Sequence, residues 1–353
     1  MDSIITSYIP NIVNNPYALN VRRLIQLQGY TTLPIRDCLS NPRTFHKCKV
    51  FNFNWYDSAA TLSEYMRKRM LLGLLHLTRK KIIYTLHNKQ PHNQTNSSYS
   101  VRLMKYMCRK ADAIVGLCPD TRIVVQGLAP EALQKLRIIP HPNYIENYDS
   151  SEIKSLRSRY GIADTDMVFL FIGSISPYKN VELLIDTFKK IKQDEIFLIL
   201  AGNPSSAEYG DELFKRISGA PNILCDFRYI PDDEIEKFYN TADIVVLPYH
   251  KTSSLNSGAV FLSFSFKKTV ICPDIGTINA LEDRTFVYDY HYDDESEHAV
   301  QLETAIIRAC TDYENNPNII RNKGEHAYEY VAVRHSDELI SKLYGELYRE
   351  LVR

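Results

Sequence analysis

The 353-residue sequence lacks several features that would place it in a narrow class of proteins. Its seven cysteines are scattered and form no C-x-x-C pair, which argues against a zinc site or a disulfide framework. The longest lipophilic run, residues 70–77, is far shorter than the roughly 20 residues that span a bilayer. No basic start followed by an apolar stretch marks a secretory signal. We therefore expect a cytoplasmic protein with reduced thiols.

The sequence also has no net charge, with 42 basic and 42 acidic residues, but its two halves differ in sign. Residues 1–150 hold 20 Lys and Arg against 9 Asp and Glu (+11), and residues 151–353 hold 22 against 33 (−11). Residues 61–110 contain 11 basic side chains and one acidic side chain, Glu64. The first half is therefore expected to face an anionic membrane surface, a phosphorylated substrate or a nucleic acid. Alternatively, both halves face solvent, and their opposite charges only attract the two halves to each other.

Short β-rich runs alternate with longer helical patterns along the whole chain. This alternation predicts parallel sheets covered by helices on both faces. A polar stretch near residues 145–160 separates two such series, so we predict an α/β protein with two doubly wound, Rossmann-like domains facing a cleft. The first covers residues 1–150, with a C-terminal helix at 337–353 packing back on it, and the second covers 151–336. The expected strands are 4–9, 49–53, 82–86, 113–117, 136–139, 168–172, 196–201, 223–225, 244–247, 269–272 and 286–288.

Two loops of the second half have the composition of a diphosphate site. A hydrophobic strand runs into Gly173, and Lys179 follows where a helix is expected to open. A second strand leads through a polar loop to Ser257-Gly258, at the start of an apolar helix. Glycine lets a ligand approach the backbone, and helix N-termini favour anions. A solvated lysine and a plain serine N-cap are the structural alternatives, and the capping role of Ser257 is compatible with phosphate binding.

In the first half, polar and aromatic residues follow the predicted strands. His87 ends the strand at 82–86, and Asn52-Phe-Asn-Trp-Tyr-Asp57 follows another. Because ligands bind at the carboxyl ends of strands in open α/β sheets, these residues are candidates for contacts with a sugar. His87 could equally be a structural histidine, and Trp55, the only tryptophan, a core residue.

The order and spacing of these motifs resemble glycosyltransferases of the GT-B architecture, close to the family 4 group and its bacterial capsule and exopolysaccharide relatives. Gly173 to Lys179 resembles the donor-phosphate loop G-R-x-x-x-x-K, and the segment 227–249 is similar to the nucleotide-side segment. Thr85-Leu-His-Asn88 with Pro91-His92 resembles the histidine motif near the transferred sugar. The resemblance implies a donor site of Gly173, Ser174, Lys179, Tyr229, Ile230, Ser257, Gly258 and Ala259, and an acceptor side of Asn14, Asn15, Trp55, Asn88 and His92.

The sequence departs from the family pattern at three places. Ser174 replaces the arginine of the phosphate loop, and Leu255 and Ser263 replace two glutamates that many relatives place eight residues apart. Asn14-Asn15 replaces a Gly-Gly loop. These changes leave the donor and the stereochemical outcome open.

We predict a nucleotide-sugar-dependent hexosyltransferase that extends a bacterial surface polysaccharide on a lipid-linked acceptor at the inner face of the membrane. No metal and no other cofactor is expected, because Lys179 and two helix N-termini can stabilise the leaving diphosphate. His87 is the candidate catalytic residue, and Asp57 is the candidate base for an inverting reaction or, alternatively, a helix N-cap. A nucleotide-sugar epimerase and a nucleic-acid-binding protein are the competing functions, although nucleic acid is not the expected partner because known binding motifs are absent.

Overall fold

The computed structural model describes residues 4–10, 15–90, 97–148, 154–191 and 195–353. These residues form two compact units. Unit 1 comprises Met1–Pro142, Thr252–Asn256 and His335–Arg353, and unit 2 comprises Asn143–Lys251 and Ser257–Arg334. Each unit has its own core of buried apolar side chains around a sheet. The two units are described separately below.

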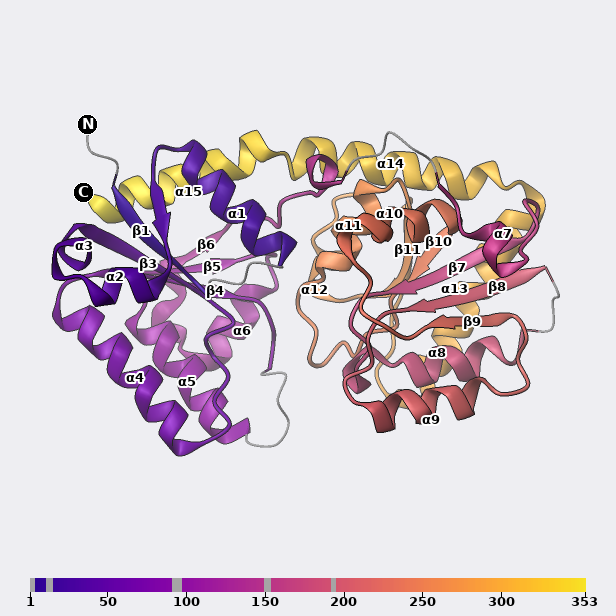
Figure 1. Ribbon diagram of the computed structural model, residues 1–353, viewed down its shortest axis with the longest axis horizontal. Coiled ribbons are helices and arrows are strands. Elements are labelled where there is room, and N and C mark those ends of the chain that lie inside the picture. The colour runs from indigo at the N-terminus through magenta and orange to yellow at the C-terminus, as the bar shows by residue number, and fades with distance from the viewer. Residues whose placement is uncertain (1–3, 11–14, 91–96, 149–153, 192–194) are drawn as a thin grey trace. The chain divides into compact units, whose positions relative to one another are not determined.

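Unit 1 contains a six-stranded sheet in the order β2-β1-β3-β4-β5-β6, with every pair parallel. Figure 1 shows α1 (Pro16–Leu27) and α15 (Asp337–Val352) on one face of the sheet, and α4 (Leu62–Leu77) and α5 (Ser97–Lys110) on the other. The remaining elements are β1 (Ile5–Ile9), β2 (Thr31–Leu33), α2 (Ile35–Ser40), α3 (Pro42–Lys47), β3 (Cys48–Asn54), β4 (Lys81–Leu86), β5 (Ala113–Gly116), α6 (Thr121–Leu128), η2 (Pro130–Lys135) and β6 (Leu136–Ile138).

Unit 2 contains a second six-stranded parallel sheet, in the order β12-β11-β10-β7-β8-β9. Figure 1 shows α8 and α9 on one face and α10 and α11 on the other. The strands are β7 (Met167–Ile172), β8 (Ile196–Ala201), β9 (Ile223–Asp226), β10 (Ile244–Val246), β11 (Thr269–Pro273) and β12 (Tyr288–Tyr290). The helices are η3 (Ile145–Asn147), α7 (Arg157–Tyr160), η4 (Pro177–Lys179), α8 (Val181–Phe188), α9 (Ala207–Ile217), α10 (Asp232–Thr241), α11 (Gly258–Ser265), α12 (Gly276–Asn279), α13 (Glu295–Asn315) and α14 (Asn318–Arg334).

The predicted fold class, two doubly wound parallel sheets, is confirmed. Strands such as Met-Val-Phe-Leu-Phe-Ile of β7 are buried at every position, as expected for strands covered on both faces. The three-residue edge strand β2 was not predicted, because Thr-Thr-Leu is too short to show a periodic pattern. Helix α14 was also not predicted, because its charged and apolar residues are not clearly separated onto opposite faces of the helix.

The helical pattern of the sequence predicts a helix at 58–77, whereas α4 begins four residues later, at Leu62. The side chain of Thr61 caps it by accepting the N–H of Glu64 at 3.2 Å, and the Glu64 carboxylate accepts the N–H of Ala60 at 3.0 Å. This reciprocal cap fixes the start of the helix at Leu62. The alternative role of Asp57 as the N-cap of this helix is therefore wrong.

Helix α15 returns from the end of the chain to the core of unit 1. Ile340, Tyr344 and Tyr348 are at most 1% exposed and pack in the same cluster as residues of α1 and β3. The Ser341 hydroxyl donates a hydrogen bond to the Leu24 carbonyl of α1 at 2.9 Å. Burying aromatic side chains of this size contributes a few kcal/mol each to stability. The helix thereby holds the Tyr348 hydroxyl beneath the centre of the sheet.

Candidate functional site

The carboxyl ends of β7, β8 and β9 in unit 2 surround a cavity of about 400 Å³. Gly173 leaves β7 with φ +125°, a conformation that side chains rarely adopt. Its N–H donates a hydrogen bond to the Ala201 carbonyl at 3.0 Å. Further along the same loop, the N–H of Ile175 donates to the carbonyl of Asn203, in the loop after β8, at 2.9 Å. Of the residues that the sequence suggests for the donor, the cavity is lined by Gly173, Ser174, Tyr229 and Ile230.

Gly202 is a residue of this cavity that sequence analysis missed. Its φ is +144°, and a Cβ atom added to it would lie 1.8 Å from the Gly173 carbonyl oxygen. Only glycine therefore allows the loops after β7 and β8 to touch. The sequence signal was available, because Gly202 follows a hydrophobic strand just as Gly173 does.

Lys179 lies in the turn η4, immediately before α8 rather than within that helix. The Nζ atom lies 5.9 Å from the ring centroids of Phe171, Tyr178 and Tyr249, and it donates to the Ser174 hydroxyl at 3.1 Å. Burial among these rings lowers the pKa of Lys179 to about 8. Within the described residues it makes no ion pair with a carboxylate. The ammonium group is therefore available to an anion.

Tyr249 connects the lysine to the second predicted phosphate element. Besides its ring contact with Lys179, Tyr249 lies near Ser257: burial raises the pKa of the Tyr249 hydroxyl, and the Ser257 side chain acts in the opposite direction. The main chain adds a second link, because His250 N–H donates to the Tyr178 carbonyl at 3.2 Å. The structure thus brings the Gly173–Lys179 loop and the start of α11 together within unit 2. Tyr249 ends the run of buried residues that follows β10, and nothing in the sequence of that run marks Tyr249 as a functional residue.

Ser257 caps α11, with its hydroxyl accepting the N–H of Val260 at 3.3 Å. Its own N–H donates to the Thr277 hydroxyl at 2.9 Å, so the residue is tied in place on both sides. Gly258 and Ala259 form the first turn and are partly exposed. First-turn N–H groups have no partner within a helix and carry the positive end of its dipole, which suits an anion.

The two family glutamates have no counterpart here. Leu255 is fully buried, and the Ser263 hydroxyl donates to the Ala259 carbonyl at 2.7 Å inside α11. At the rim of the cavity, Tyr229 is 62% exposed and Ile230 is buried. Among the described residues at this rim, the exposed Tyr229 ring offers an aromatic surface on which a nucleobase could stack.

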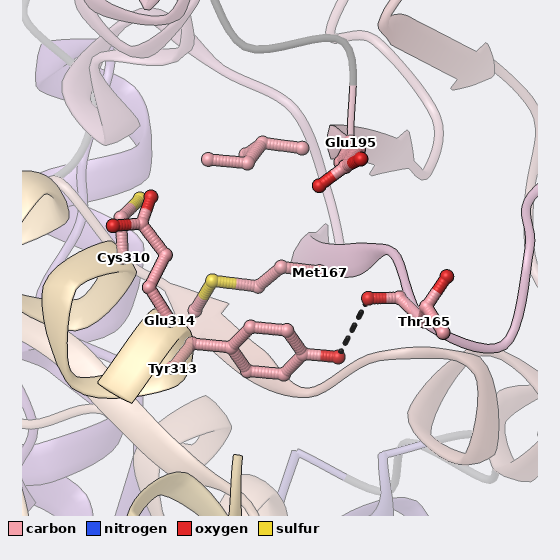
Figure 2. Close-up of a pocket in the computed structure, with 7 residues that line it drawn as sticks. Thr165, Met167, Glu195, Cys310, Tyr313 and Glu314 are labelled. Carbon is pink, nitrogen blue, oxygen red and sulfur yellow. Dashed lines mark hydrogen bonds between the residues drawn. The ribbon is translucent and has the colours of Figure 1, made fainter. Parts of the chain in front are cut away.

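A second cavity of unit 2, about 310 Å³ in volume, lies at the opposite edge of the sheet. Figure 2 shows Glu195, Glu314 and Met167 around it, with the Tyr313 hydroxyl donating to the Thr165 carbonyl at 3.3 Å. It lies at the amino ends of β7 and β8, away from the strand ends that hold the loops described above. We assign it no part in the site.

In unit 1, His87 follows β4 and is enclosed by aromatic rings. The Trp55 indole stacks on its imidazole at a centroid distance of 4.1 Å and an interplanar angle of 17°, and the Tyr17 ring meets it edge-on at 5.2 Å. Its Nε2 lies 3.0 Å from the Asn54 Oδ1. Trp55 has φ +49°, a conformation that costs about 1–3 kcal/mol outside glycine and is typical of functional sites.

The cluster contains residues that sequence analysis missed. Tyr17, the first α1 residue after the N1 proline, also contacts the His141 ring at 4.7 Å. Burial lowers the pKa of His141 to about 3 and that of His335 to about 4, so both rings are neutral at physiological pH. The His335 Nδ1 lies 2.6 Å from the His141 carbonyl oxygen. These contacts join segments far apart in sequence, which explains why no local motif predicted them.

The other acceptor-side candidates have mixed positions. The Asn15 side chain caps α1 by accepting the N–H of Ala18 at 3.0 Å. Asn88 follows His87 and is half-buried. The main chain at His87 is held by Asn256, whose Nδ2 donates to the His87 carbonyl at 3.0 Å. Asn14 and His92 lie outside the described residues.

Asp57 lies apart from the aromatic cluster. Its Oδ2 accepts a hydrogen bond of 2.6 Å from the Tyr84 hydroxyl, and it is only 9% exposed. Side chains alternate between the faces of a strand, so Tyr84 points to the face opposite Ile83 and Thr85 of the same strand. Burial, with Asp57 beside it, raises the pKa of Tyr84 well above its usual range. The Asp57 carboxylate is therefore placed on the α4–α5 side of the sheet.

Among the described residues, no group of three or more His, Cys, Asp or Glu side chains is placed to hold a metal ion. The same residues include no helix that is both long enough and apolar enough to cross a bilayer.

Comparisons with known proteins agree with this geometry. Residues 152–324, which include the Gly173 loop, Lys179 and α11, match the family described as Glycosyl transferases group 1. The whole chain superposes on the Anabaena protein Alr3699/HepE in complex with UDP-glucose with a TM-score of 0.72 and 15% identity, covering 98% of this chain and 99% of that one. The matched residues therefore belong to a glycosyltransferase family, and the chain has the GT-B fold, as the sequence predicts.

The curated relatives that the chain matches include hexosyltransferases. It is 24% identical over 306 residues to the GDP-mannose:glycolipid 4-beta-D-mannosyltransferase of Xanthomonas campestris pv. campestris, covering 80% of this chain and 78% of that protein. It is 29% identical over 144 residues to the lipopolysaccharide 1,2-N-acetylglucosaminetransferase of Salmonella typhimurium, covering 36% and 38%. These likenesses favour a transferase over an epimerase.

Proposed function

We propose that this glycosyltransferase transfers a hexose from a nucleoside diphosphate sugar to a lipid-linked saccharide during synthesis of a bacterial surface polysaccharide. The observation that carries the proposal is the cavity beside Gly173, with the Lys179 ammonium and the start of α11 near it on either side of Tyr249. Two sources of positive potential at one strand edge suit a diphosphate, whose charge grows as the sugar leaves. The acceptor would bind unit 1.

The donor nucleotide would lie with its diphosphate against Lys179 and its base near Tyr229. GDP-mannose is the first donor to test, because it is named for the Xanthomonas relative. His87 is proposed as the residue at the transferred hexose, since a neutral imidazole can hydrogen-bond a sugar hydroxyl without repelling an oxocarbenium-like transition state. The geometry favours His87 over Asp57 for this position, because the Asp57 carboxylate is buried against Tyr84.

A cavity of about 360 Å³ in unit 1 is the proposed region for the acceptor. It lies beside α6 and the loop after β4, and its largely apolar lining includes the 71% exposed side chain of Ile123. Lys89, two residues after His87, lies at the same cavity. The Asp120 carboxylate lines the cavity as well, so apolar side chains stand there beside one basic and one acidic group, which suits an amphiphile such as a lipid-linked saccharide.

Turnover in the presence and absence of acceptor tests this function. Each of GDP-mannose, UDP-N-acetylglucosamine and UDP-glucose is first screened for thermal stabilisation, since a ligand at 100 times its Kd adds about 2.7 kcal/mol. Release of nucleoside diphosphate only when a lipid-linked saccharide is added supports the transferase. Conversion of the nucleotide sugar without acceptor would instead indicate an epimerase, and salt-dependent retention of DNA on a filter would indicate nucleic-acid binding.

Attachment to the membrane is the second part of the proposal, and α4 supports it. The helix buries Tyr65, Leu72 and Leu75 in unit 1, yet a second apolar face remains exposed. We call this face the α4 stripe. Its five members recur at spacings of three or four residues, so they lie on one side of the helix. They are between 46% and 80% exposed: Leu62, Met66, Met70, Leu74 and Leu77.

The charges around the α4 stripe determine the partner that it suits. Arg67, Arg69 and Arg79 are exposed on or next to the same helix, and Arg102 and Lys105 are exposed on α5, which packs against it. An exposed apolar stripe flanked by cations is typical of helices that lie in the interface of an anionic bilayer. The sequence of this helix suggests five apolar side chains for such a contact, at 66, 70, 71, 74 and 75. Met66, Met70 and Leu74 are exposed, while Leu75 is core and Leu71 is half-buried.

Co-sedimentation with phosphatidylglycerol vesicles tests the attachment. Met70→Asp with Leu77→Asp should abolish binding, and Arg67→Glu should weaken it several-fold, because each cation near anionic lipid contributes about 1 kcal/mol. Val333→Asp is the matched control, since Val333 is 68% exposed on α14 of unit 2. Equal binding to phosphatidylcholine vesicles, or binding that survives the double substitution, would remove membrane attachment from the proposal.

A further inference from the structure

An arginine beside the donor cavity joins the two ends of the loop between β9 and α10. Arg228 lies between Asp226, the last residue of β9, and Glu234, in the first turn of α10. Its Nε and Nη2 donate to the two carboxylate oxygens of Asp226 at 2.8 and 3.1 Å. Its Nη2 and Nη1 donate to the two oxygens of Glu234 at 2.6 and 3.3 Å. We call this arrangement the Arg228 bridge.

The last N–H of the guanidinium is directed at the main chain of the same loop. The Nη1 of Arg228 also lies 3.4 Å from the Tyr229 carbonyl oxygen, to which it donates. A guanidinium has five N–H groups in a fixed planar fork. With this contact every one of them has an acceptor within the protein. Arg228 therefore has no donor left for a ligand, and it acts on the loop instead.

The contact with the Tyr229 carbonyl fixes the direction of a peptide group. The Tyr229–Ile230 peptide is trans, and the C=O and N–H of a trans peptide point in opposite directions. Because the Tyr229 carbonyl faces Arg228, the Ile230 N–H points away from the Arg228 bridge. Among the described residues this N–H has no hydrogen-bond acceptor. Tyr229 and Ile230 line the cavity of about 400 Å³, and Arg228 does not.

The Arg228 bridge is also connected to the glycine contact that shapes the cavity. The main-chain carbonyl of Asp226 accepts the N–H of Gly202 and the N–H of Arg228, both at 3.0 Å. The Arg228 side chain is 38% exposed, and ion pairs with this exposure contribute little to global stability. Its geometric effect, in contrast, falls on the part of the loop that lines the cavity. A role in ligand binding explains this placement better than a role in stability.

We propose that Arg228 is a positioning residue for the nucleotide: together with Asp226 and Glu234 it holds the Tyr229–Ile230 peptide so that the Ile230 N–H and the Tyr229 ring face the nucleoside part of the donor. The inference rests on the proposed function, because it takes this cavity to hold that nucleoside. Arg228 itself does not touch the ligand.

Titration calorimetry on the full chain tests the role, with GDP, UDP and inorganic pyrophosphate as probes. Arg228→Ala should weaken the nucleoside diphosphate that the wild type binds by about tenfold, the loss of one well-oriented hydrogen bond. Pyrophosphate has no base, so its affinity should not change. Arg216→Ala is the matched control, because Arg216 is 34% exposed and pairs with Asp186 on the helices of unit 2. It should change neither affinity, and the melting temperatures of the two variants should be similar.

Substitutions of Glu234 separate positioning from direct contact. Glu234→Leu removes one side of the Arg228 bridge and should weaken the nucleoside diphosphate, whereas Glu234→Gln keeps an acceptor oxygen and should recover most of the affinity. Adding Glu234→Leu to Arg228→Ala should cost little more, because the bridge is already broken. If Arg228 contacted the nucleotide itself, Glu234→Leu would leave the affinity unchanged or raise it, and the positioning role would be wrong.

Kinetics give a second readout. Arg228→Ala should raise the KM for the nucleotide sugar by about the same factor and leave kcat unchanged, because contacts with the base are equal in the ground state and the transition state. Equal affinities of wild type and Arg228→Ala, or an equal loss for pyrophosphate, would overturn the inference and leave the proposed function standing. A wild type that binds none of the three probes would refute the donor site, and the positioning role would fall with it.

Discussion

At the scale of single residues, Lys179 carries the charge that the proposed reaction depends on most. Its ammonium lies among three aromatic rings and donates a hydrogen bond to the Ser174 hydroxyl. We predict that Lys179→Ala lowers turnover by roughly 10²–10³, the usual cost of removing one donor to a developing negative charge. Lys190→Ala is the control, because Lys190 forms an exposed ion pair with Glu303 elsewhere in unit 2. Near-wild-type turnover of Lys179→Ala would refute the assignment.

The same residue gives a prediction for pH. Burial holds the pKa of Lys179 at about 8, so the free protein loses this positive charge as the pH rises through that value. A diphosphate binds the charged form and raises its pKa, so nucleotide affinity should be constant below pH 8 and then fall by up to tenfold per pH unit. In Lys179→Arg the charge persists, and the dependence should flatten. Titration calorimetry over a pH series measures this, and equal slopes in both proteins would contradict it.

Asp57 and Tyr84 form a pair whose function a double-mutant cycle can resolve. Their hydrogen bond is buried, so we expect Asp57→Asn and Tyr84→Phe each to destabilise the fold by about 1–3 kcal/mol, with the double substitution costing less than their sum. Turnover should fall no further in Asp57→Asn than in Tyr84→Phe. A loss of 10²–10⁴ in Asp57→Asn alone, with donor binding intact, would instead identify Asp57 as the general base of an inverting enzyme.

At the scale of elements, the contact between the loops after β7 and β8 depends on one glycine. Gly202→Ala would place a Cβ against the Gly173 carbonyl oxygen, so we expect nucleotide binding to be lost as the loops move apart. Gly219→Ala is the matched control, because Gly219 also has a positive φ but open space around it. Both variants should lose some thermal stability from strain, and only Gly202→Ala should lose the nucleotide-dependent rise in melting temperature. Equal behaviour of the two would show that the contact is not needed.

The sequence predicted those elements whose pattern is local. Gly173 and Ser257 could be found because a buried strand, a polar loop and a helix start follow one another within a few residues. The start of α4 was placed too early, because helix-favouring residues precede the cap formed by Thr61 and Glu64 and extend the helical pattern beyond it. Tyr249 and His141 gained their roles only through contacts with Lys179 and Tyr17, which lie tens of residues away. No single-sequence pattern encodes such pairs.

At the scale of the whole molecule, the two units have separate cores and opposite charge. Tyr344 and Leu24 lie in the cluster of unit 1, whereas Phe169 and Phe188 lie in that of unit 2. The basic excess belongs to residues 1–150, where membrane and acceptor are proposed to bind, and the acidic excess to the remainder. The nucleotide is proposed to bind the half with net negative sequence charge, so its proposed site depends on a local cation and helix N-termini rather than on a general positive field.

This division predicts where a nucleotide should stabilise the molecule. A nucleoside diphosphate without the sugar has its proposed contacts in unit 2, so hydrogen–deuterium exchange should slow in the loops after β7 and β8 and in the first turn of α11. Exchange in β3 and in α15 of unit 1 should be unchanged, because these elements hold the His87 side of the site and not the diphosphate. The Lys179→Ala protein measured with the same nucleotide is the control and should show little protection anywhere. Slowed exchange confined to unit 1 would place the nucleotide in the wrong unit and refute the donor site described above.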